Sequence, residues 1–318
     1  MAEAILKVEN LSKSFPSKNG TDDVVRDLSF EVKRGEIFGF LGPNGAGKTT
    51  TIKMLTTQLK PTNGNIKLAD EPIWEKLTNT RRRISVVTQH NNLDRGLTAR
   101  ENLLFHARYF NLPQKESKKR ADHFLDIMGL SKRADDQVGN FSGGMAQRLK
   151  IARALMHDPD ILFLDEPTTG LDPQSRVLLW DEIKELNQKG TTIFLTTHYM
   201  EEPEQLCDRV AILDEGHIRA LDSPEELKKR VPGKNVVSIR TGEINEDLVN
   251  EAKDLPKVED VRAEMGTLRF YMKDAAPDMS ELVGWLNNKG INILSLNLHV
   301  STLNDVFVHL TGRGLEQR

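Results

Sequence analysis

A glycine-rich stretch after the apolar run Ile37 to Leu41 holds the residues best suited to chemistry. Three glycines precede a lysine and two hydroxyl residues, and the stretch reads Gly42, Pro43, Asn44, Gly45, Ala46, Gly47, Lys48, Thr49 and Thr50. Backbone N–H groups can wrap a polyanion only where side chains are absent, and a helix that starts here adds further N–H groups. A lysine then contacts the β and γ phosphates, and a threonine hydroxyl can bind Mg²⁺. Because a strand precedes it and a helix follows, the stretch predicts a phosphate-binding loop rather than an accidental glycine-rich turn.

Two adjacent acidic residues, Asp165 and Glu166, end a second apolar run, Ile161 to Leu164. Successive side chains of a strand point to opposite sides, so the two carboxylates can have different tasks. We expect Asp165 to reach the Mg²⁺ and Glu166 to face the attacking water as a general base. Apolar strands that end in acids are common, so this pattern indicates hydrolysis only in combination with the phosphate-binding loop.

A second phosphate-binding design begins at Ser142, which can cap a helix and is followed by Gly143 and Gly144. One chain thus carries two loops that suit a single triphosphate. The economical resolution is that the Ser142 loop binds the phosphate held by a partner subunit.

Strands that alternate with helices must position these residues. Apolar or alternating runs predict strands over 5–8, 28–32, 37–41, 84–88, 161–164 and 192–196, with helices from Gly47, over 173–188 and over 200–207. From about residue 90 to 160 the spacing is helical, which indicates an inserted helical subdomain. The alternation predicts an α/β fold with a parallel sheet.

The pattern starts again after a linker-like segment, 231–235. It predicts strand 236–240, helix 245–254, strand 258–263, strand 267–272, helix 279–288, strand 291–298 and helix 303–311. The order βαββαβ is that of a ferredoxin-like sandwich with a terminal helix added. We therefore expect two domains, 1–230 with its helical subdomain at about 90–160, and a small C-terminal α+β domain over 235–318.

Composition excludes several classes of protein. The chain has 318 residues with 44 basic and 47 acidic side chains, and its net charge of −3 disfavours a strongly basic nucleic-acid binder. A mean hydropathy of −0.47, without an apolar run near 20 residues, argues against a membrane-spanning chain. The N-terminus does not resemble a signal peptide, and the single Cys207 suits a buried thiol in a reducing cytoplasm.

These patterns occur in the order found in the ATP-binding subunits of ABC transporters, which the chain resembles over about residues 3 to 230. The order is Gly42 to Thr49, Gln89, Ser142 to Gly144, Asp165 with Glu166, Gly170 to Asp172, and His198. The resemblance implies an ABC cassette of the phosphate-loop NTPase class that binds and hydrolyses ATP with Mg²⁺.

The resemblance also implies roles for four further residues. Phe15 would stack on adenine, and Gln89 would touch Mg²⁺ or the water while sensing the membrane partner. His198 would hydrogen-bond the γ-phosphate, and Asp172 would act across a dimer interface. Without the resemblance, Phe15 is expected in the core, Gln89 on the surface and His198 in a structural role.

Two chains should then pack head to tail around two ATP molecules, as a homodimer. Each site would use Lys48, Thr49, Gln89, Asp165, Glu166 and His198 of one subunit with Ser142 to Gly144 of the other. Met145 stands where the family usually has glutamine. We expect weaker polar support around the Ser142 loop, but not inactivity, because Ser142 and the glycine amides would contact the phosphate.

A chain without a membrane span requires an integral membrane permease for transport. By the resemblance, the permease would dock at residues 94–106, beside Gln89. Segments 197–209 and 303–313 resemble the daunorubicin-resistance type of exporter ATPase, which has a small C-terminal domain. We expect export of a hydrophobic drug, lipid or polysaccharide, with the chain peripheral at the cytoplasmic face of the membrane.

Other interpretations fit the sequence less well. A soluble ABC ATPase of DNA repair would separate the halves of the cassette by a long coiled coil, and ribosome-acting members usually have two cassettes. Neither feature is present, so no nucleic-acid partner is expected. A phosphate-loop kinase does not explain the Ser142 loop or His198. The C-terminal domain carries no catalytic cluster, and it could either brace the dimer or bind a regulatory ligand.

Overall fold

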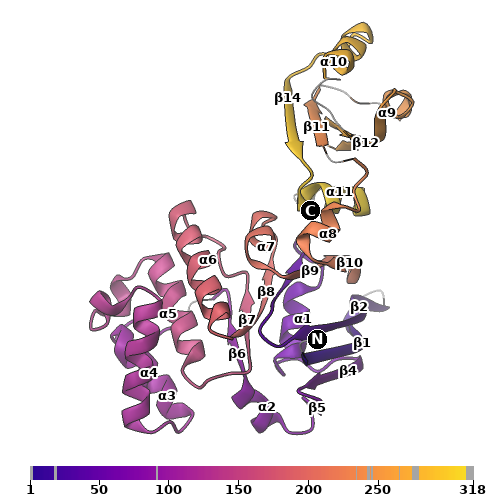
Figure 1. The fold of residues 1–318 in the computed structure, drawn as a ribbon. Coiled ribbons are helices and arrows are strands. Elements are labelled where there is room, and N and C mark those ends of the chain that lie inside the picture. Colours follow the sequence, from indigo (N-terminus) through magenta and orange to yellow (C-terminus); the bar gives the residue numbers. More distant parts are fainter. Residues whose placement is uncertain are drawn as a thin grey trace. The chain divides into compact units, whose positions relative to one another are not determined.

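The chain divides into two units, Met1–Ile218 and Arg219–Arg318, in the computed structural model (Figure 1). The structure describes residues 3–17, 20–90, 92–233, 235–241, 244, 246–264, 266–273 and 279–312. Each unit has its own sheet and core. The domain division predicted at 230–235 stays a prediction.

A six-stranded sheet in the order β10-β9-β3-β8-β7-β6 forms the core of the first unit. Its strands are β3 (Ile37–Leu41), β6 (Ile84–Val87), β7 (Ile161–Asp165), β8 (Thr192–Thr197), β9 (Arg209–Asp214) and β10 (His217–Asp222). The pairs β3–β8, β3–β9, β7–β8 and β6–β7 are parallel, so the carboxyl ends of these strands meet at one edge. All residues of β3, β7 and β8 are buried, as expected for a parallel sheet with two covered faces. The predicted α/β fold is confirmed.

Helices connect these strands along the chain. They are α1 (Lys48–Leu55), α2 (Leu77–Arg83), α6 (Pro173–Gln188) and α7 (Glu201–Leu206). The predicted bounds of α6 are confirmed because the helix has two clear local start signals. Asp172 caps its first turn, and Pro173 takes the first helical position, where no N–H is needed. The single cysteine, Cys207, is buried as predicted.

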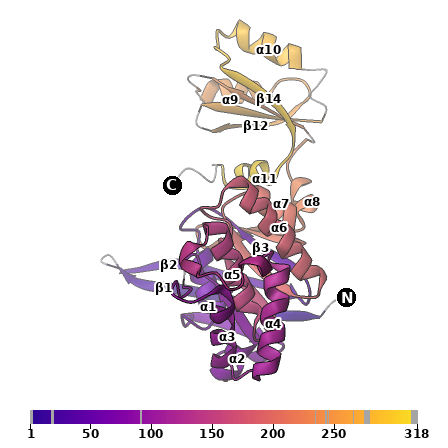
Figure 2. The ribbon, with the colours of Figure 1, turned by 90° about the vertical axis from the view of Figure 1, so that its left-hand side faces the viewer.

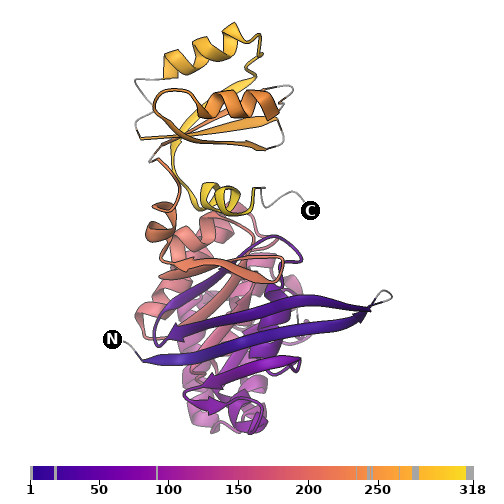
Figure 3. The same ribbon diagram turned by 90° about the vertical axis from the view of Figure 1, so that its right-hand side faces the viewer.

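A second, antiparallel sheet in the order β2-β1-β4-β5 completes the first unit (Figure 3). It consists of β1 (Ala4–Ser17), β2 (Gly20–Lys33), β4 (Asn63–Leu68) and β5 (Glu71–Pro72). The sequence predicted strands only over 5–8 and 28–32. Pairing of β1 with β2 continues far beyond these apolar runs, through several irregularities in register that the sequence pattern does not reveal.

Three helices form the inserted subdomain (Figure 2): α3 (Ala99–Tyr109), α4 (Gln114–Ile127) and α5 (Gly143–Leu155). Each of them packs against the other two. Thr98 and Glu101 form a reciprocal capping box at the start of α3, which satisfies N–H groups that a helix otherwise leaves free. Two short 3₁₀ turns, Ser131–Arg133 and Val138–Asn140, lead into α5.

The second unit contains a four-stranded antiparallel sheet in the order β12-β13-β11-β14. Its elements are α8 (Pro224–Lys228), β11 (Asn235–Arg240), α9 (Glu246–Lys253), β12 (Val258–Glu264), β13 (Thr267–Met272), α10 (Met279–Asn288), β14 (Ser295–Val300) and α11 (Leu303–Thr311). The predicted βαββαβ order is confirmed. Of the residues in the predicted segments, Lys234, Asn245 and Arg313 lie outside the described part of the chain.

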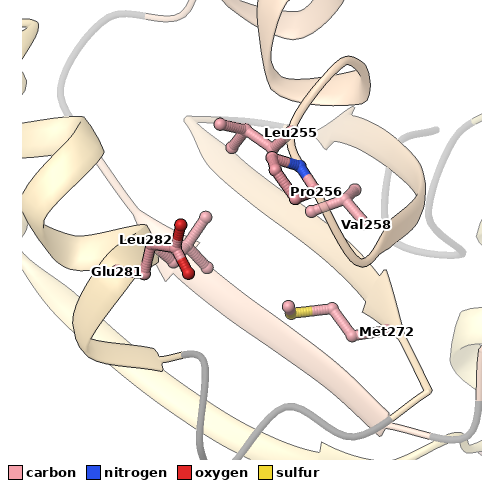
Figure 4. Close-up of a pocket in the computed structure, with 6 residues that line it drawn as sticks. All are labelled: Leu255, Pro256, Val258, Met272, Glu281 and Leu282. Carbon is pink, nitrogen blue, oxygen red and sulfur yellow. The ribbon is translucent and has the colours of Figure 1, made fainter.

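One predicted strand of this unit was wrong at its start, because β14 begins at Ser295 and not at Ile291. The N–H of Ile291 donates to Leu286 O at 3.1 Å, so this segment first closes the end of α10. A small apolar pocket lies near the start of α10 (Figure 4). It is lined by Leu255, Pro256, Val258, Met272, Glu281 and Leu282.

Candidate active site

The glycine-rich loop connects β3 to α1 at the carboxyl edge of the parallel sheet. Gly47, immediately before α1, has φ = 99°, a conformation that side chains rarely adopt. A Cβ atom on Gly47 would lie 2.8 Å from Val24 O, and one on Gly42 would lie 2.4 Å from Leu213 O. The glycines are therefore required by close backbone packing as well as by loop shape. The pocket at this loop is lined by Val24, Asn44, Gly45, Gly47, Lys48, Thr49, Thr50 and Glu166.

Lys48 is the buried cation of this pocket. Its Nζ donates to Gly42 O at 2.7 Å and to Pro43 O at 3.1 Å, and it lies 3.5 Å from Glu166 Oε1. Burial lowers the pKa of Lys48, while the neighbouring Glu166 acts in the opposite direction. Ala46 is fully buried and donates its N–H to Pro43 O at 3.2 Å, which tightens the loop. The loop thus holds a buried ammonium group, which can attract phosphate, and the carboxylate of Glu166 lies beside it.

Asp165 ends β7 with a buried carboxylate that has only hydroxyl donors. Thr196 Oγ1 donates to Asp165 Oδ1 at 2.7 Å, and Thr49 Oγ1 donates to the same atom at 3.3 Å. Burial raises the pKa of Asp165, and the negative charge of Glu166 adds to this effect. A carboxylate and a hydroxyl on adjoining elements are oxygen ligands of the kind that Mg²⁺ prefers. The residues at this position therefore fit the metal that the sequence predicts.

Side chains from several elements surround the carboxylate of Glu166. Gln89 Nε2 donates to Glu166 Oε2 at 2.7 Å, and Thr169 Oγ1 donates to the same oxygen at 3.1 Å. His198 Nδ1 lies 3.1 Å from that oxygen, and Lys48 lies near the other one. Glu166 also has φ = 49°, which is uncommon outside glycine and typical of functional sites. The structure thus brings Lys48, Gln89 and His198 together around one carboxylate.

Ser142 and Asp172 form a second cluster at the starts of α5 and α6. Ser142 Oγ accepts from Met145 N at 3.2 Å, and Asp172 accepts from Ser175 N at 2.9 Å. A Cβ atom on Gly144 would lie 2.8 Å from Ser175 Oγ, so the two helix starts pack closely. Ser142 and Gly143 are not buried, and Gly143 is exposed. Among the described residues that line the phosphate pocket, none belongs to this cluster.

Phe15 lies on β1, opposite Asp22 of β2, and is half-buried. Lys13 Nζ lies 5.1 Å from the centre of its ring. Without the family resemblance Phe15 was expected in the core, and the structure contradicts that expectation. Its ring is not among the described residues that line the phosphate pocket.

Two residues of the site were missed by the sequence reasoning, Thr196 and Thr169. Both donate to the carboxylates, Thr196 to Asp165 and Thr169 to Glu166. Thr169 is only three positions from Glu166, so its proximity could have been noticed. Thr196 becomes a partner of Asp165 only because β7 and β8 are neighbours in the sheet.

The phosphate-binding loop after β3, the two acidic residues at the end of β7 in the same sheet and the inserted helical subdomain together define the ABC class of ATPase. Residues 25–169 match the family described as ABC transporter. Residues 223–311 match the C-terminal domain of ATP-binding proteins like DrrA1-3.

Two curated relatives and one solved structure extend this likeness. The linearmycin resistance ATP-binding protein LnrL of Bacillus subtilis is 38% identical over 98% of this chain and 99% of the relative. Nod factor export ATP-binding protein I of Cupriavidus metallidurans is 42% identical over 98% of both chains. The ATP-binding cassette MJ0796, solved as a post-hydrolysis dimer with ADP and Pi, is 28% identical. Its TM-score is 0.62, with 69% of this chain and 98% of that chain covered.

The chain belongs to the family of ABC transporter ATP-binding subunits, the ATP-hydrolysing subunits of these transporters. The relatives that it matches over nearly its whole length are named for linearmycin resistance and for Nod factor export. Among the residues described by the structure, no helix has the length and apolar character needed to cross a bilayer.

Proposed function

We propose that this chain hydrolyses ATP to drive export of a hydrophobic drug, lipid or polysaccharide through a separate membrane permease. The observation that carries the proposal is the convergence of Lys48, Gln89 and His198 on the Glu166 carboxylate beside the phosphate loop. Export, in particular, is supported by the Nod factor export relative, and the linearmycin resistance relative is consistent with it. The same relatives disfavour the alternative of a soluble ATPase that acts on nucleic acid or the ribosome.

Within the site, each residue has a distinct proposed task. Lys48 and the N–H groups of the loop bind the β and γ phosphates. Glu166 accepts the proton of the attacking water, and Gln89 and His198 orient that water and the γ-phosphate. Their placement around a single carboxylate supports these roles, because a general base must be within hydrogen-bond reach of the proton it removes.

Thr49, Gln89 and Asp165 are the residues proposed to hold Mg²⁺. When bound there, the metal neutralises charge on the phosphate oxygens. Asp165 accepts hydrogen bonds from two hydroxyl groups and from no cation in the described chain, so its charge is available to a divalent ion.

The functional assembly is proposed to be a homodimer in which Ser142, Gly143, Gly144 and Asp172 face the partner's ATP. The accessibility of Ser142 and Gly143 at the start of α5 supports this, because a helix N-terminus with free N–H groups binds anions. The dimeric state of the MJ0796 cassette with ADP and Pi supports it as well. Phosphate departure would then remove the charge that joins the two subunits and open the dimer.

Docking of the permease is proposed at the exposed side of α3, within the predicted segment 94–106. Phe105 is 70% exposed and Tyr109 is 79% exposed. A groove beside them is lined by Leu97, Glu101, Leu104, Phe105, Arg108, Leu112, Gln114, Ser117 and Lys118. Large exposed apolar side chains next to a groove are typical of a surface that receives a partner helix. Attachment there would place the chain at the cytoplasmic face of the membrane.

The C-terminal domain, proposed as residues 235–318, is assigned the role of bracing the dimer. The alternative is that this domain binds a regulatory ligand. The residues proposed for the nucleotide chemistry all lie within residues 1–230.

Glu166→Gln tests the proposed function, because it removes the base and keeps the shape of the side chain. Turnover should fall by about 10²–10⁴-fold, the usual contribution of a general base, while ATP binding is retained. Phosphate release and binding of a fluorescent ATP analogue measure the two effects, and light scattering should show the variant held as a dimer by ATP. Exposed Glu9 provides the matched control, Glu9→Gln, with unchanged turnover. Wild-type turnover in Glu166→Gln would refute the assignment.

A further inference from the structure

Lys150 is a buried cation of α5 that the proposed mechanism does not use. Only 5% of the surface of Lys150 is exposed to solvent. Lysine is almost never fully buried unless it is paired, because loss of hydration disfavours the ammonium group. No carboxylate of the described chain forms an ion pair with Lys150, so its burial must have another explanation.

Two main-chain carbonyl groups provide that explanation. Lys150 Nζ donates to Thr88 O at 2.9 Å and to Gln89 O at 3.4 Å. Burial and the nearby Arg153 lower the pKa of Lys150 to about 8, so the ammonium is held at a free-energy cost. A charged donor forms stronger hydrogen bonds than a neutral one, which makes Lys150 an effective anchor for the backbone at Gln89.

Gln89 connects this anchor to the catalytic carboxylate. Lys150 holds its backbone oxygen, while its side-chain Nε2 donates to Glu166 Oε2 at 2.7 Å. Among the described residues, Lys150 is the only cationic side chain that donates a hydrogen bond to the carbonyl oxygens of Thr88 and Gln89. Arg153, one turn later on α5, donates to Asn92 O at 2.8 Å and holds the same segment further along.

We propose that Lys150 is a positioning residue, which holds the main chain of Gln89 so that the Gln89 amide reaches Glu166. This inference rests on the proposed role of Glu166 and adds a residue that no motif predicted. Because Ser142 caps the start of α5, the contact also ties the position of Gln89 to the helix that follows the loop proposed to bind the partner's ATP.

A double-mutant cycle of Lys150→Met and Gln89→Ala tests this proposal. Methionine is unbranched and apolar, so it suits a buried position while it removes the donors. We expect each single variant to lower kcat by about 10-fold with KM for ATP changed by less than about 3-fold. The double variant should also lose about 10-fold, because both changes break the same connection. Lys119→Met, at an exposed lysine of α4, is the matched control and should keep wild-type kcat.

Two outcomes would overturn the proposal: wild-type kcat in Lys150→Met, or a loss of about 100-fold in the double variant, which would show independent effects. If Lys150→Met does not fold, Lys150→Leu, which also lacks donors, takes its place in the cycle with the same expectations. Lys150→Arg keeps the cationic donors and should stay within about 3-fold of wild-type kcat. If Glu166→Gln retains turnover, the proposed function fails. If Glu166→Gln is inactive and the cycle shows independent effects, only the role of Lys150 fails.

Discussion

Asp165 of the first unit and Asp305 of the second are both buried carboxylates, but their partners differ in kind. Asp165 accepts hydrogen bonds from the hydroxyls of Thr49 and Thr196. Asp305 accepts from Arg269 Nη1 at 3.0 Å and from Thr302 N at 2.9 Å, and it lies 3.0 Å from His299 Nε2. Burial raises the pKa of Asp165. In Asp305 burial acts in the same direction, but hydrogen bonds from His299 and Thr302 outweigh it and lower the pKa.

This difference distinguishes a carboxylate that serves a site from one that serves the fold. The hydrogen-bonding capacity of Asp305 is used internally: it caps α11 and fastens that helix to the sheet of the second unit. Among the described residues Asp165 accepts side-chain hydrogen bonds from neutral hydroxyls only, and the nearby charge of Lys48 does not outweigh burial, so a cation that binds there would stabilise its ionised form. A buried charge with weak internal compensation is therefore the better guide to function.

Asp165→Asn should produce the largest effect, and it should fall on activity. The amide keeps the shape of the side chain but removes the charge proposed to hold Mg²⁺, whose contribution to catalysis is several kcal/mol. Turnover should fall by about 10³-fold, measured as Mg²⁺-dependent phosphate release. Thermal stability should be unchanged or raised, since an uncompensated buried charge is removed. If Asp165→Asn lost stability but kept normal turnover, Asp165 would serve the fold and not the site.

Asp305→Asn should instead reduce stability. Removing the charge of Asp305 leaves Arg269 with Glu264 Oε2, at 3.3 Å, as its remaining ion-pair partner, and the free energy of unfolding of the second unit should drop by about 2 kcal/mol. Hydrogen exchange of amides in β11, β13 and α11 measures this local effect. Asp254→Asn, at an exposed aspartate of the same unit, should change stability by less than about 0.5 kcal/mol. Equal protection in the Asp305 and Asp254 variants would contradict the assigned role.

The pH dependence of stability should have opposite signs for the two residues. The lowered pKa of Asp305 adds stability above the ordinary value of 3.8, and this is lost as pH falls through the folded-state pKa. The raised pKa of Asp165 lowers the free energy of unfolding, and this loss of stability develops as pH rises from 3.8 through the folded-state pKa. A tenfold difference between the acid dissociation constants of the folded and unfolded states corresponds to about 1.4 kcal/mol of stability.

Unfolding free energies between about pH 7 and pH 3 should therefore separate the two variants. The advantage of wild type over Asp305→Asn should shrink on acidification. The disadvantage of wild type relative to Asp165→Asn should also shrink, because both forms become neutral. If acidification widened either difference, the pKa direction assigned to that residue would be wrong.

Much of the fold was predictable where the signals are local. The bounds of α6, α10 and α11 follow from caps and apolar spacing, and the βαββαβ order follows from short alternating runs. The strand β4 was not predicted, because it begins with the turn-forming residues Asn63, Gly64 and Asn65. It becomes a strand by pairing with β1, which is distant in sequence. Lys150 likewise has no local signal, since only packing of α5 near β6 brings it to Gln89.

The sequence by itself determined the chemistry that depends on neighbouring positions. The glycine loop before Lys48, the Asp165–Glu166 pair and the caps at Ser142 and Asp172 each require residues only a few positions apart. Tertiary structure alone decided which groups meet Glu166, because Lys48, Gln89 and His198 come from different strand ends. It also decided the opposite pKa shifts of Asp165 and Asp305. The physical reason is that burial and hydrogen-bond partners depend on which strands and helices are neighbours in space, and chain order does not specify those neighbours.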